Sequence, residues 1–232
     1  MILLEGIRFA YPGGPLVVEV DRLEVGPGLI LLLGPNGAGK STLLRMIAGV
    51  ERPGQGRIAI HGHDLWREEI ASRKLLAYLP EQPELTPYAT VREILQLVCR
   101  LRGVAEAEGS RALERVGLAT DAARSVRQMS LGQRRRAVLA AALVGTQPVL
   151  LLDEPLEAMD RAMRDEIVAW IHGAVEQGRT VIAASHEFDD FAEIAHAALA
   201  VRGGVAALHP LPAGSAERSM LLDRLARGLG GE

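Results

Sequence analysis

The stretch GPNGAGKST, residues 34–42, decides the fold of this chain. It follows an apolar run at residues 29–33 that is typical of a buried strand, and it precedes Leu43, Leu44 and Ile47, which recur at helical spacing. A strand, a glycine-rich loop and a helix in this order form the P-loop motif. The sequence therefore predicts an α/β core that is built around this loop.

The residue types of the loop are those that bind a phosphate chain. Glycines allow tight turns that point successive backbone N–H groups at an anion, and the positive end of the following helix faces the same anion. Lys40 supplies a charge for the terminal phosphates, and the hydroxyl of Ser41 is placed to hold Mg²⁺. We predict that a nucleoside triphosphate is bound by Gly34, Asn36, Gly37, Ala38, Gly39, Lys40, Ser41 and Thr42.

The composition is that of an ordinary globular protein with a small acidic excess. The chain has 232 residues, of which 48% are apolar and 24% charged, and its net charge is −3, which does not indicate a nucleic-acid partner. The single cysteine, Cys99, excludes an internal disulfide and fits a reducing cytoplasm. No apolar stretch approaches the ~18–20 residues that cross a bilayer, and the N-terminus does not resemble a secretory signal, so we expect no direct insertion into a membrane.

Apolar runs along the chain predict three regions. Strands are expected at residues 2–9, 16–20, 28–33 and 56–60, and again at 149–152, 180–184 and 197–202. Residues 90–144 have a helical pattern, which begins at Thr90 as N-cap and is divided by Gly103, Gly109 and Gly117; further helices are expected at 134–145, 160–177 and 187–195. We expect one α/β domain with a mostly parallel sheet flanked by helices and with antiparallel strands at its N-terminus. Residues 1–82 and 146–210 form this core, residues 83–145 an inserted all-helical subdomain, and residues 211–232 a tail with a helix at 215–227.

A second motif, LLLDEP at residues 150–155, is an apolar strand that ends in two acids. Buried parallel strands deliver their last residues to the sheet edge where ligands bind in α/β folds, and the P-loop leaves the same edge. Asp153 is then placed to hold Mg²⁺, and Glu154 to polarise an attacking water. The alternative interpretation is an acid pair that caps the next helix.

Further motifs complete a resemblance to the nucleotide-binding subunits of ATP-binding cassette (ABC) transporters, which covers residues 2 to about 202. Tyr11 matches the aromatic residue that stacks on adenine. Gln82 matches the Q-loop glutamine, which contacts Mg²⁺ and the water and opens the helical lobe. MSLGQ, residues 129–133, matches the signature motif. Residues 157–160 match the D-loop with its Asp160, and His186 matches the switch histidine near the γ-phosphate.

Two of these motifs depart from the family pattern. Leu131 replaces the first of the two signature glycines, while Ser130, Gly132 and Gln133 remain. Glu157 and Met159 alter the usual SALD sequence of the D-loop. Neither change touches the residues expected to carry chemistry, so the resemblance implies an active ATPase that uses ATP and Mg²⁺. In that reading Glu154 is the general base, and His186 holds the water and the γ-phosphate in line.

The resemblance also implies partners. Two cassettes dock head to tail, as a homodimer or with a related ATPase subunit, and each ATP lies between the P-loop of one chain and Ser130, Gly132 and Gln133 of the other. A separate membrane permease is expected to contact residues 83–101, which would hold the chain at the inner face of the cell membrane. The sequence around residues 78–82 and 85–93 resembles export-type systems, so export is expected. The alternative is a soluble ABC-class ATPase of translation or DNA maintenance. The run Arg134–Arg136 is expected to supply one contact between lobes or to phosphate.

Overall fold

A computed structural model describes residues 1–82, 85–157 and 159–229. Its N-terminal part is antiparallel: β1 pairs with β2 on one side and with β4 on the other, and β4 pairs with the short β5. Much of β1 and β2 alternates buried and more exposed residues, as expected of a sheet with one covered face. Their bounds are β1 (Ile2–Ala10), β2 (Leu16–Val25), β4 (Gln55–Ile60) and β5 (His63–Asp64).

The second part of the sheet is mostly parallel. The strand that leads into the P-loop lies at its centre, between β9 and β8, and the order within the described chain is β5-β4-β1-β2-β10-β9-β3-β8-β7-β6. Among the described residues, the strands of the two parts pair where Val205 of β10 lies beside Glu19 of β2. The bounds are β3 (Gly28–Leu33), β6 (Leu76–Leu79), β7 (Val149–Asp153), β8 (Thr180–Ala184), β9 (Ala197–Arg202) and β10 (Val205–Pro210).

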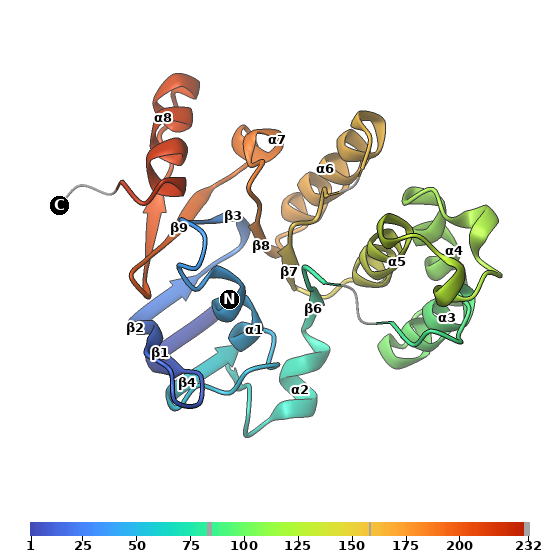
Figure 1. Cartoon of the computed structure of the whole chain (residues 1–232), viewed down its shortest axis with the longest axis horizontal. Coiled ribbons are helices and arrows are strands. Elements are labelled where there is room, and N and C mark those ends of the chain that lie inside the picture. The colour runs from blue at the N-terminus through green and yellow to red at the C-terminus, as the bar shows by residue number, and fades with distance from the viewer. Residues whose placement is uncertain (83–84, 158, 230–232) are drawn as a thin grey trace.

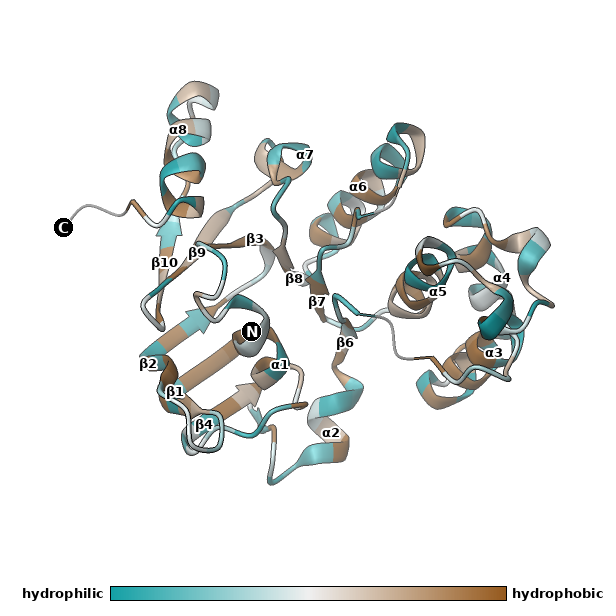
Figure 2. Cartoon of the chain, in the orientation of Figure 1, coloured by the Kyte–Doolittle hydropathy of each residue, from teal (hydrophilic) through white to brown (hydrophobic). Residues whose placement is uncertain are grey.

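Alternation along the buried strands sorts side chains into two cores. Ile30 and Leu32 of β3 pack in the first core, together with helix α1 (Lys40–Ile47) and the antiparallel strands. Leu29, Leu31 and Leu33 face the other side, where the remaining long helices pack. Every residue of β3, β7 and β8 is buried, which fits the continuous apolar runs of the sequence. Figure 2 shows the apolar colour along β1 and β7. The P-loop helix is thus held between two sheet regions.

Three helices form a group to one side of the sheet (Figure 1). They are α3 (Val91–Arg102), α4 (Glu106–Arg115) and α5 (Leu131–Leu143), and α5 contacts both α3 and α4 as well as β6. Thr90 caps α3 with a capping box, as expected, and Gly103 ends it in the left-handed conformation. The short 3₁₀ helices η1 (Ala119–Asp121) and η2 (Val126–Gln128) lead from α4 to α5.

The other helices cover the sheet. Helices α6 (Arg161–Glu176), α7 (Asp189–Ala192) and α8 (Ser215–Ala226) pack on the second core, where α8 buries Leu222 and Leu225. Helix α2 (Glu69–Lys74) lies beside β6. The tail helix expected at residues 215–227 is therefore an integral part of the packed domain. In the described part of the chain, no helix combines the length and apolarity that a membrane span requires.

The predicted fold class is confirmed, but several expected elements are corrected. Strands β6 and β10 are not among the predicted strands, and the helix expected at 187–195 covers only Asp189–Ala192. The signature helix begins at Leu131, three residues before the expected start. Gly109 lies inside α4 and does not divide two helices. A Cβ on Gly109 would lie 3.1 Å from Cys99 Sγ and 3.2 Å from Leu95 Cβ, so the glycine allows close packing of α4 on α3.

Candidate functional site

The P-loop joins β3 to α1, as the sequence predicts, and its glycines are required by close approaches. Gly34 has φ 147°, and a Cβ there would lie 2.3 Å from the carbonyl oxygen of Val201. Gly39 is the N-cap of α1 in the left-handed conformation, with φ 103°. Only a glycine combines these backbone angles with such close neighbours. The result is a helix N-terminus whose free N–H groups open onto the loop.

Lys40 folds back over this loop. Its Nζ donates hydrogen bonds to the carbonyl oxygens of Gly34 at 2.8 Å and Pro35 at 3.2 Å. Burial lowers the pKa of Lys40, and the carboxylates of Glu154, Asp153 and Glu81 oppose that shift. The ammonium group therefore lies within electrostatic reach of three acids.

A cavity of about 410 Å³ opens over the loop. The hydroxyl of Tyr11 lies 3.2 Å from Thr42 Oγ1, and its ring meets that of Phe9 edge-on at 4.9 Å between centroids. Tyr11 remains 37% exposed and lines the cavity, so its ring is accessible to a planar ligand there. The lining residues are Tyr11, Val17, Asn36, Gly37, Gly39, Lys40, Ser41, Thr42 and Glu81. Of the expected P-loop contacts, Gly34 and Ala38 do not line this cavity; the N–H of Ala38 donates to Pro35 O at 3.2 Å.

The carboxyl end of β7 brings two acids toward the loop. Asp153 is 4% exposed, and its Oδ2 is buried without a hydrogen-bond partner among the described residues. Burial raises the pKa of the Asp153 carboxyl, and a hydrogen bond from Ser41 opposes the rise. A buried carboxylate oxygen that lacks a donor is an energetically unfavourable arrangement. It fits a position where a cation belongs.

Glu154 is held in an unusual conformation beside β8. Its φ is +51°, a left-handed value that is uncommon outside glycine, and its N–H donates to Ala184 O at 2.8 Å. The N–H of His186 donates to Glu154 Oε1 at 3.0 Å, and the Ser185 hydroxyl lies 3.3 Å from Oε2. The His186 ring approaches the same carboxylate, with Nε2 3.7 Å from Oε1. Burial raises the pKa of Glu154, while the charge and N–H of His186 oppose that rise.

The structure places the residues after β6 differently from the sequence-based expectation. Glu81 lines the P-loop cavity and is close enough to influence the charges of Lys40 and Asp153. Gln82 lines a separate hollow of about 510 Å³, together with Arg45, Val50, Glu51, Tyr78, Pro80, Leu85 and Val138. The assignment of Gln82 came from its match to the Q-loop glutamine of the family. Sequence reasoning therefore missed Glu81, and it also missed Ser185 next to the expected His186.

The signature residues do not join the P-loop of their own chain. None of residues 130–133 is among the described residues that line the cavity over the loop. Ser130 caps α5: its Oγ accepts from Gln133 N at 3.2 Å, and Gln133 Oε1 accepts from Ser130 N at 2.9 Å. Leu131, which stands in place of a glycine, is 66% exposed. Asp160 caps α6 by accepting from Met163 N at 2.9 Å. Both groups are ordered helix starts apart from the P-loop.

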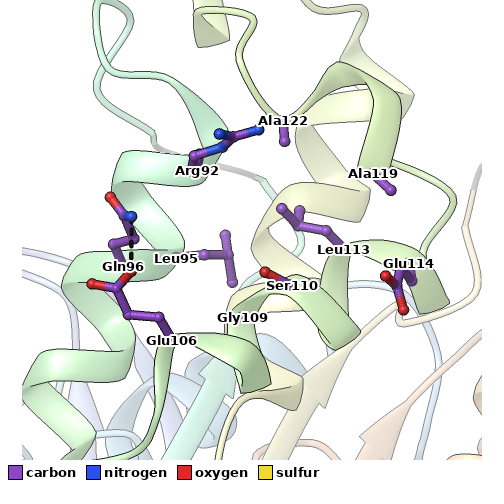
Figure 3. Close-up of a pocket in the computed structure, with 10 residues that line it drawn as sticks. All are labelled: Arg92, Leu95, Gln96, Glu106, Gly109, Ser110, Leu113, Glu114, Ala119 and Ala122. Atoms are coloured by element: carbon purple, nitrogen blue, oxygen red, sulfur yellow. Dashed lines mark hydrogen bonds between the residues drawn. The ribbon is translucent and has the colours of Figure 1, made fainter.

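Another cavity, of about 410 Å³, lies within the helical group (Figure 3). Figure 3 shows Leu95 of α3 facing Ser110 and Leu113 of α4 across it, while Arg92 extends toward Ala122. Gln96 is already paired with Glu106, with 3.0 Å between Nε2 and Oε2. No glycine-rich loop and no cluster of acids aimed at a lysine lines this cavity in the described chain. It lacks the phosphate-binding groups that the cavity over residues 34–42 combines.

Comparisons with known proteins agree with this geometry. A thiamine import ATP-binding protein of Chelativorans sp. (strain BNC1) is 38% identical over 214 residues, which cover 89% of this chain and 85% of that protein. A nickel import ATP-binding protein of Rhodobacter capsulatus is 35% identical over 223 residues, which cover 89% and 88%. A solved ATP-binding subunit of an ABC transporter has a TM-score of 0.84 at 24% identity, over 96% of this chain and 99% of that one, and shares its fold.

Both bacterial relatives are named for import, so they do not support the expectation of an export-type system. The relatives also include a human phospholipid-transporting ATPase, 35% identical over 197 residues, which cover 82% of this chain but 9% of that protein. The family model described as ABC transporter matches residues 22–157, more than half of the chain. The chain therefore belongs to the ABC transporter family, as an ATP-binding subunit.

Proposed function

We propose that this subunit hydrolyses ATP with the residues gathered at one edge of the parallel sheet, and that this hydrolysis drives a separate permease. The observation that carries the proposal is the position of Lys40, whose ammonium group lies within electrostatic reach of the carboxylates of Asp153, Glu154 and Glu81. Strands β3 and β7 deliver the loop and the acids to the same edge, as ligand sites of α/β sheets require.

The triphosphate binds along residues 34–42. The free N–H groups at the start of α1 and the positive end of that helix attract its charge. Lys40 releases the carbonyl oxygens of Gly34 and Pro35 to reach the terminal phosphates. Adenine stacks on the open face of Tyr11, whose ring is fixed by Phe9 and Thr42. Stacking of a base on an aromatic ring contributes about 1–3 kcal/mol.

Mg²⁺ fits beside the phosphates, where Asp153 presents a buried oxygen without a donor next to Ser41. Ser41 and Asp153 would hold the ion, and Glu81 takes the position that the family resemblance assigns to Gln82. When bound, Mg²⁺ neutralises charge that develops on the phosphate oxygens. Glu81 is a carboxylate and not an amide, which gives this site one more negative charge than the expected glutamine would.

Glu154 acts as the general base toward the attacking water. The His186 N–H and the Ser185 hydroxyl orient its carboxylate, and burial raises its pKa and so makes it a better proton acceptor. The His186 ring is 62% exposed at the mouth of the site, where it can hold the water and the γ-phosphate in line. Strain at Glu154, with its positive φ, is typical of a functional position.

The signature residues serve a second cassette. Because Ser130, Gly132 and Gln133 lie apart from the P-loop of their own chain, their helix start is free to meet the ATP of a partner. The γ-phosphate then joins two positive helix ends that would otherwise repel each other. Its loss on hydrolysis lets the dimer open. Asp160 starts α6 and belongs to the same proposed interface.

The permease contacts the face that contains the hollow of Gln82, Leu85 and Val50. Val50, which lines this hollow, is 60% exposed, and Tyr88, three residues after Leu85, is 78% exposed, so both are available as apolar anchors. The expected contact surface at residues 83–101 includes Pro83 and Glu84, which lie outside the described residues. Docking there would hold the subunit at the inner face of the cell membrane. We also propose that the helical subdomain spans residues 83–145 and that the tail spans residues 211–232.

The Glu154→Gln variant tests the catalytic assignment. It preserves the shape of the side chain, so ATP binding should persist, while hydrolysis falls by about 10²–10⁴, the usual contribution of a general base. Analytical ultracentrifugation should show a dimer that forms with ATP and not with ADP. Normal hydrolysis by this variant would refute the role of Glu154. Photocrosslinkers at Leu85 and Tyr88 should capture a multi-spanning membrane protein in cells, with a crosslinker at Arg22 of β2, in the antiparallel part of the sheet, as control.

A further inference from the structure

Arg135 is an arginine of helix α5 whose guanidinium group leaves the helical group. Its Nε and Nη2 donate to the carbonyl oxygen of Glu81, at 3.1 Å and 2.7 Å. Its Nη1 forms an ion pair with Glu157 Oε2. The Arg135 side chain is only 14% exposed. All three guanidinium nitrogens are therefore used, which fixes the orientation of the planar group.

The two neighbouring arginines behave differently. Arg134 Nε donates to Val126 O at 3.1 Å, and Arg136 Nη1 donates to Val116 O at 3.1 Å. Both acceptors belong to the helical group itself. Of the three adjacent arginines, Arg135 is the one whose hydrogen bonds and ion pair reach the α/β core. The sequence predicts that this run supplies one contact between lobes or to phosphate, and Arg135 makes a contact between lobes.

Each partner of Arg135 belongs to a part of the site. Glu81 lines the P-loop cavity, and Glu157 follows the proposed base Glu154 by three residues on the segment that leads to Asp160. Glu81, Arg135, Glu154 and Glu157 also line one small hollow. Arg135 itself stands five residues after Ser130, the cap of the signature helix. One side chain thus joins the signature helix to two segments that surround the nucleotide.

The ion pair of Arg135 involves Glu157, a residue at which this chain departs from the family pattern. It occupies the position where the family pattern carries a serine, which could not balance an arginine charge. A partly buried guanidinium without a carboxylate would be unfavourable, so the replacement at position 157 and the arginine at position 135 are matched in charge.

We propose that Arg135 is a positioning residue: it fixes Glu81 and the segment after Glu154 relative to the signature helix, so that hydrolysis depends on the placement of residues 130–133. This inference rests on the proposed ATPase site. Arg135 does not touch the loop at residues 34–42, so its loss should impair the chemical step while leaving nucleotide binding intact. Small displacements of groups around a reacting centre lower the rate without abolishing ground-state binding.

The test compares Arg135→Gln, Arg135→Lys, Glu157→Gln and the double variant Arg135→Gln/Glu157→Gln. Arg111→Gln, which removes an ion pair within one exposed helix, is the matched control. For Arg135→Gln we expect kcat to fall about tenfold while KM for ATP stays within about twofold. The kcat of Glu157→Gln should fall about threefold, and Arg135→Lys should keep part of the kcat that Arg135→Gln loses. The double variant should be no slower than Arg135→Gln, because coupled residues are not additive.

Several outcomes would overturn the inference. A kcat of Arg135→Gln within twofold of the unaltered chain would do so, as would a rise in KM that accounts for the whole loss of kcat/KM. Glu157→Gln, whose side chain is 52% exposed, keeps the test decisive if Arg135→Gln does not fold. Normal kcat in both Glu157→Gln and Arg135→Lys would then refute it. Glu154→Gln is assayed in parallel. If this variant still hydrolyses ATP at the normal rate, the proposed function fails. If it has lost ATPase activity while Arg135→Gln keeps a normal kcat, the positioning role alone is refuted.

Discussion

The backbone N–H of His186 donates a hydrogen bond to the carboxylate of Glu154, with 3.0 Å between N and Oε1. This contact joins the end of β8 to the residue after β7, since Glu154 N in turn donates to Ala184 O. The donor comes from the main chain, so any residue except proline could supply it at position 186. The imidazole lies near the same carboxylate, with Nε2 3.7 Å from Oε1, and the Ser185 hydroxyl adds a side-chain contact to Oε2.

Ser185→Ala should reveal how much the side-chain contact adds. The Ser185 hydroxyl has one hydrogen and lies near two acceptors, Glu154 Oε2 at 3.3 Å and Glu187 O at 3.2 Å. Because that hydrogen is shared, we expect a modest fall in kcat, about threefold, which is within the net value of one hydrogen bond. Steady-state ATPase assays of Ser185→Ala and of the control Ser219→Ala measure it. A fall beyond a hundredfold would show that the hydroxyl is itself part of the chemistry.

Substitutions at Glu81 and Gln82 should separate the two assignments for this loop. Glu81 lines the P-loop cavity and Gln82 lines the neighbouring hollow. We expect Glu81→Ala to lower kcat at least tenfold, because a carboxylate beside Lys40 and Asp153 is lost. Gln82→Ala should leave the ATPase of the isolated subunit within about twofold. A loss of activity in Gln82→Ala beside normal activity in Glu81→Ala would support Gln82, the residue that the family resemblance implies.

The orientation of the residues in this loop could not be predicted from the sequence. The P-loop, Asp153 and Glu154 were predicted because each lies within one continuous strand-and-turn pattern of the sequence. Whether Glu81 or Gln82 faces the cavity depends on how β6 ends, and β6 has only four residues, too few for a clear pattern. Strand β10 has an apolar run at residues 205–208, but this run shows no alternation with polar residues, is mostly exposed and ends near a proline, so it does not give a clear strand signal. The link from Arg135 to Glu81 spans 54 residues and required the tertiary structure.

Tyr11 variants should separate its ring from its hydroxyl. Tyr11→Phe removes the hydroxyl that contacts Thr42 Oγ1, whereas Tyr11→Ala also removes the ring that packs on Phe9. We expect Tyr11→Phe to bind ATP within about twofold of the unaltered chain and Tyr11→Ala to bind at least fivefold more weakly, as loss of a stacking platform implies. Equilibrium titration with a fluorescent ATP analogue gives both values. Equal affinities for the two variants would exclude stacking on Tyr11.

Two glycines in helix interiors should respond oppositely to the same substitution. Gly109 of α4 is packed on α3, and a Cβ there would lie 3.1 Å from Cys99 Sγ and 3.2 Å from Leu95 Cβ. Gly173 of α6 has no atom within 4 Å of such a Cβ. Gly109→Val should lower the free energy of unfolding by about 1–3 kcal/mol through overpacking. Gly173→Val should raise it by a few tenths of a kcal/mol, since valine has a higher helix propensity than glycine.

Urea unfolding followed by circular dichroism compares the two variants under identical conditions. The pair controls for backbone effects, because both glycines lie within helices and neither has a positive φ. A destabilised Gly173→Val would mean that helix α6 needs its glycine for a reason other than packing. A stable Gly109→Val would mean that α3 and α4 can separate without loss, and then the position of the signature helix could not depend on tight packing among the three helices.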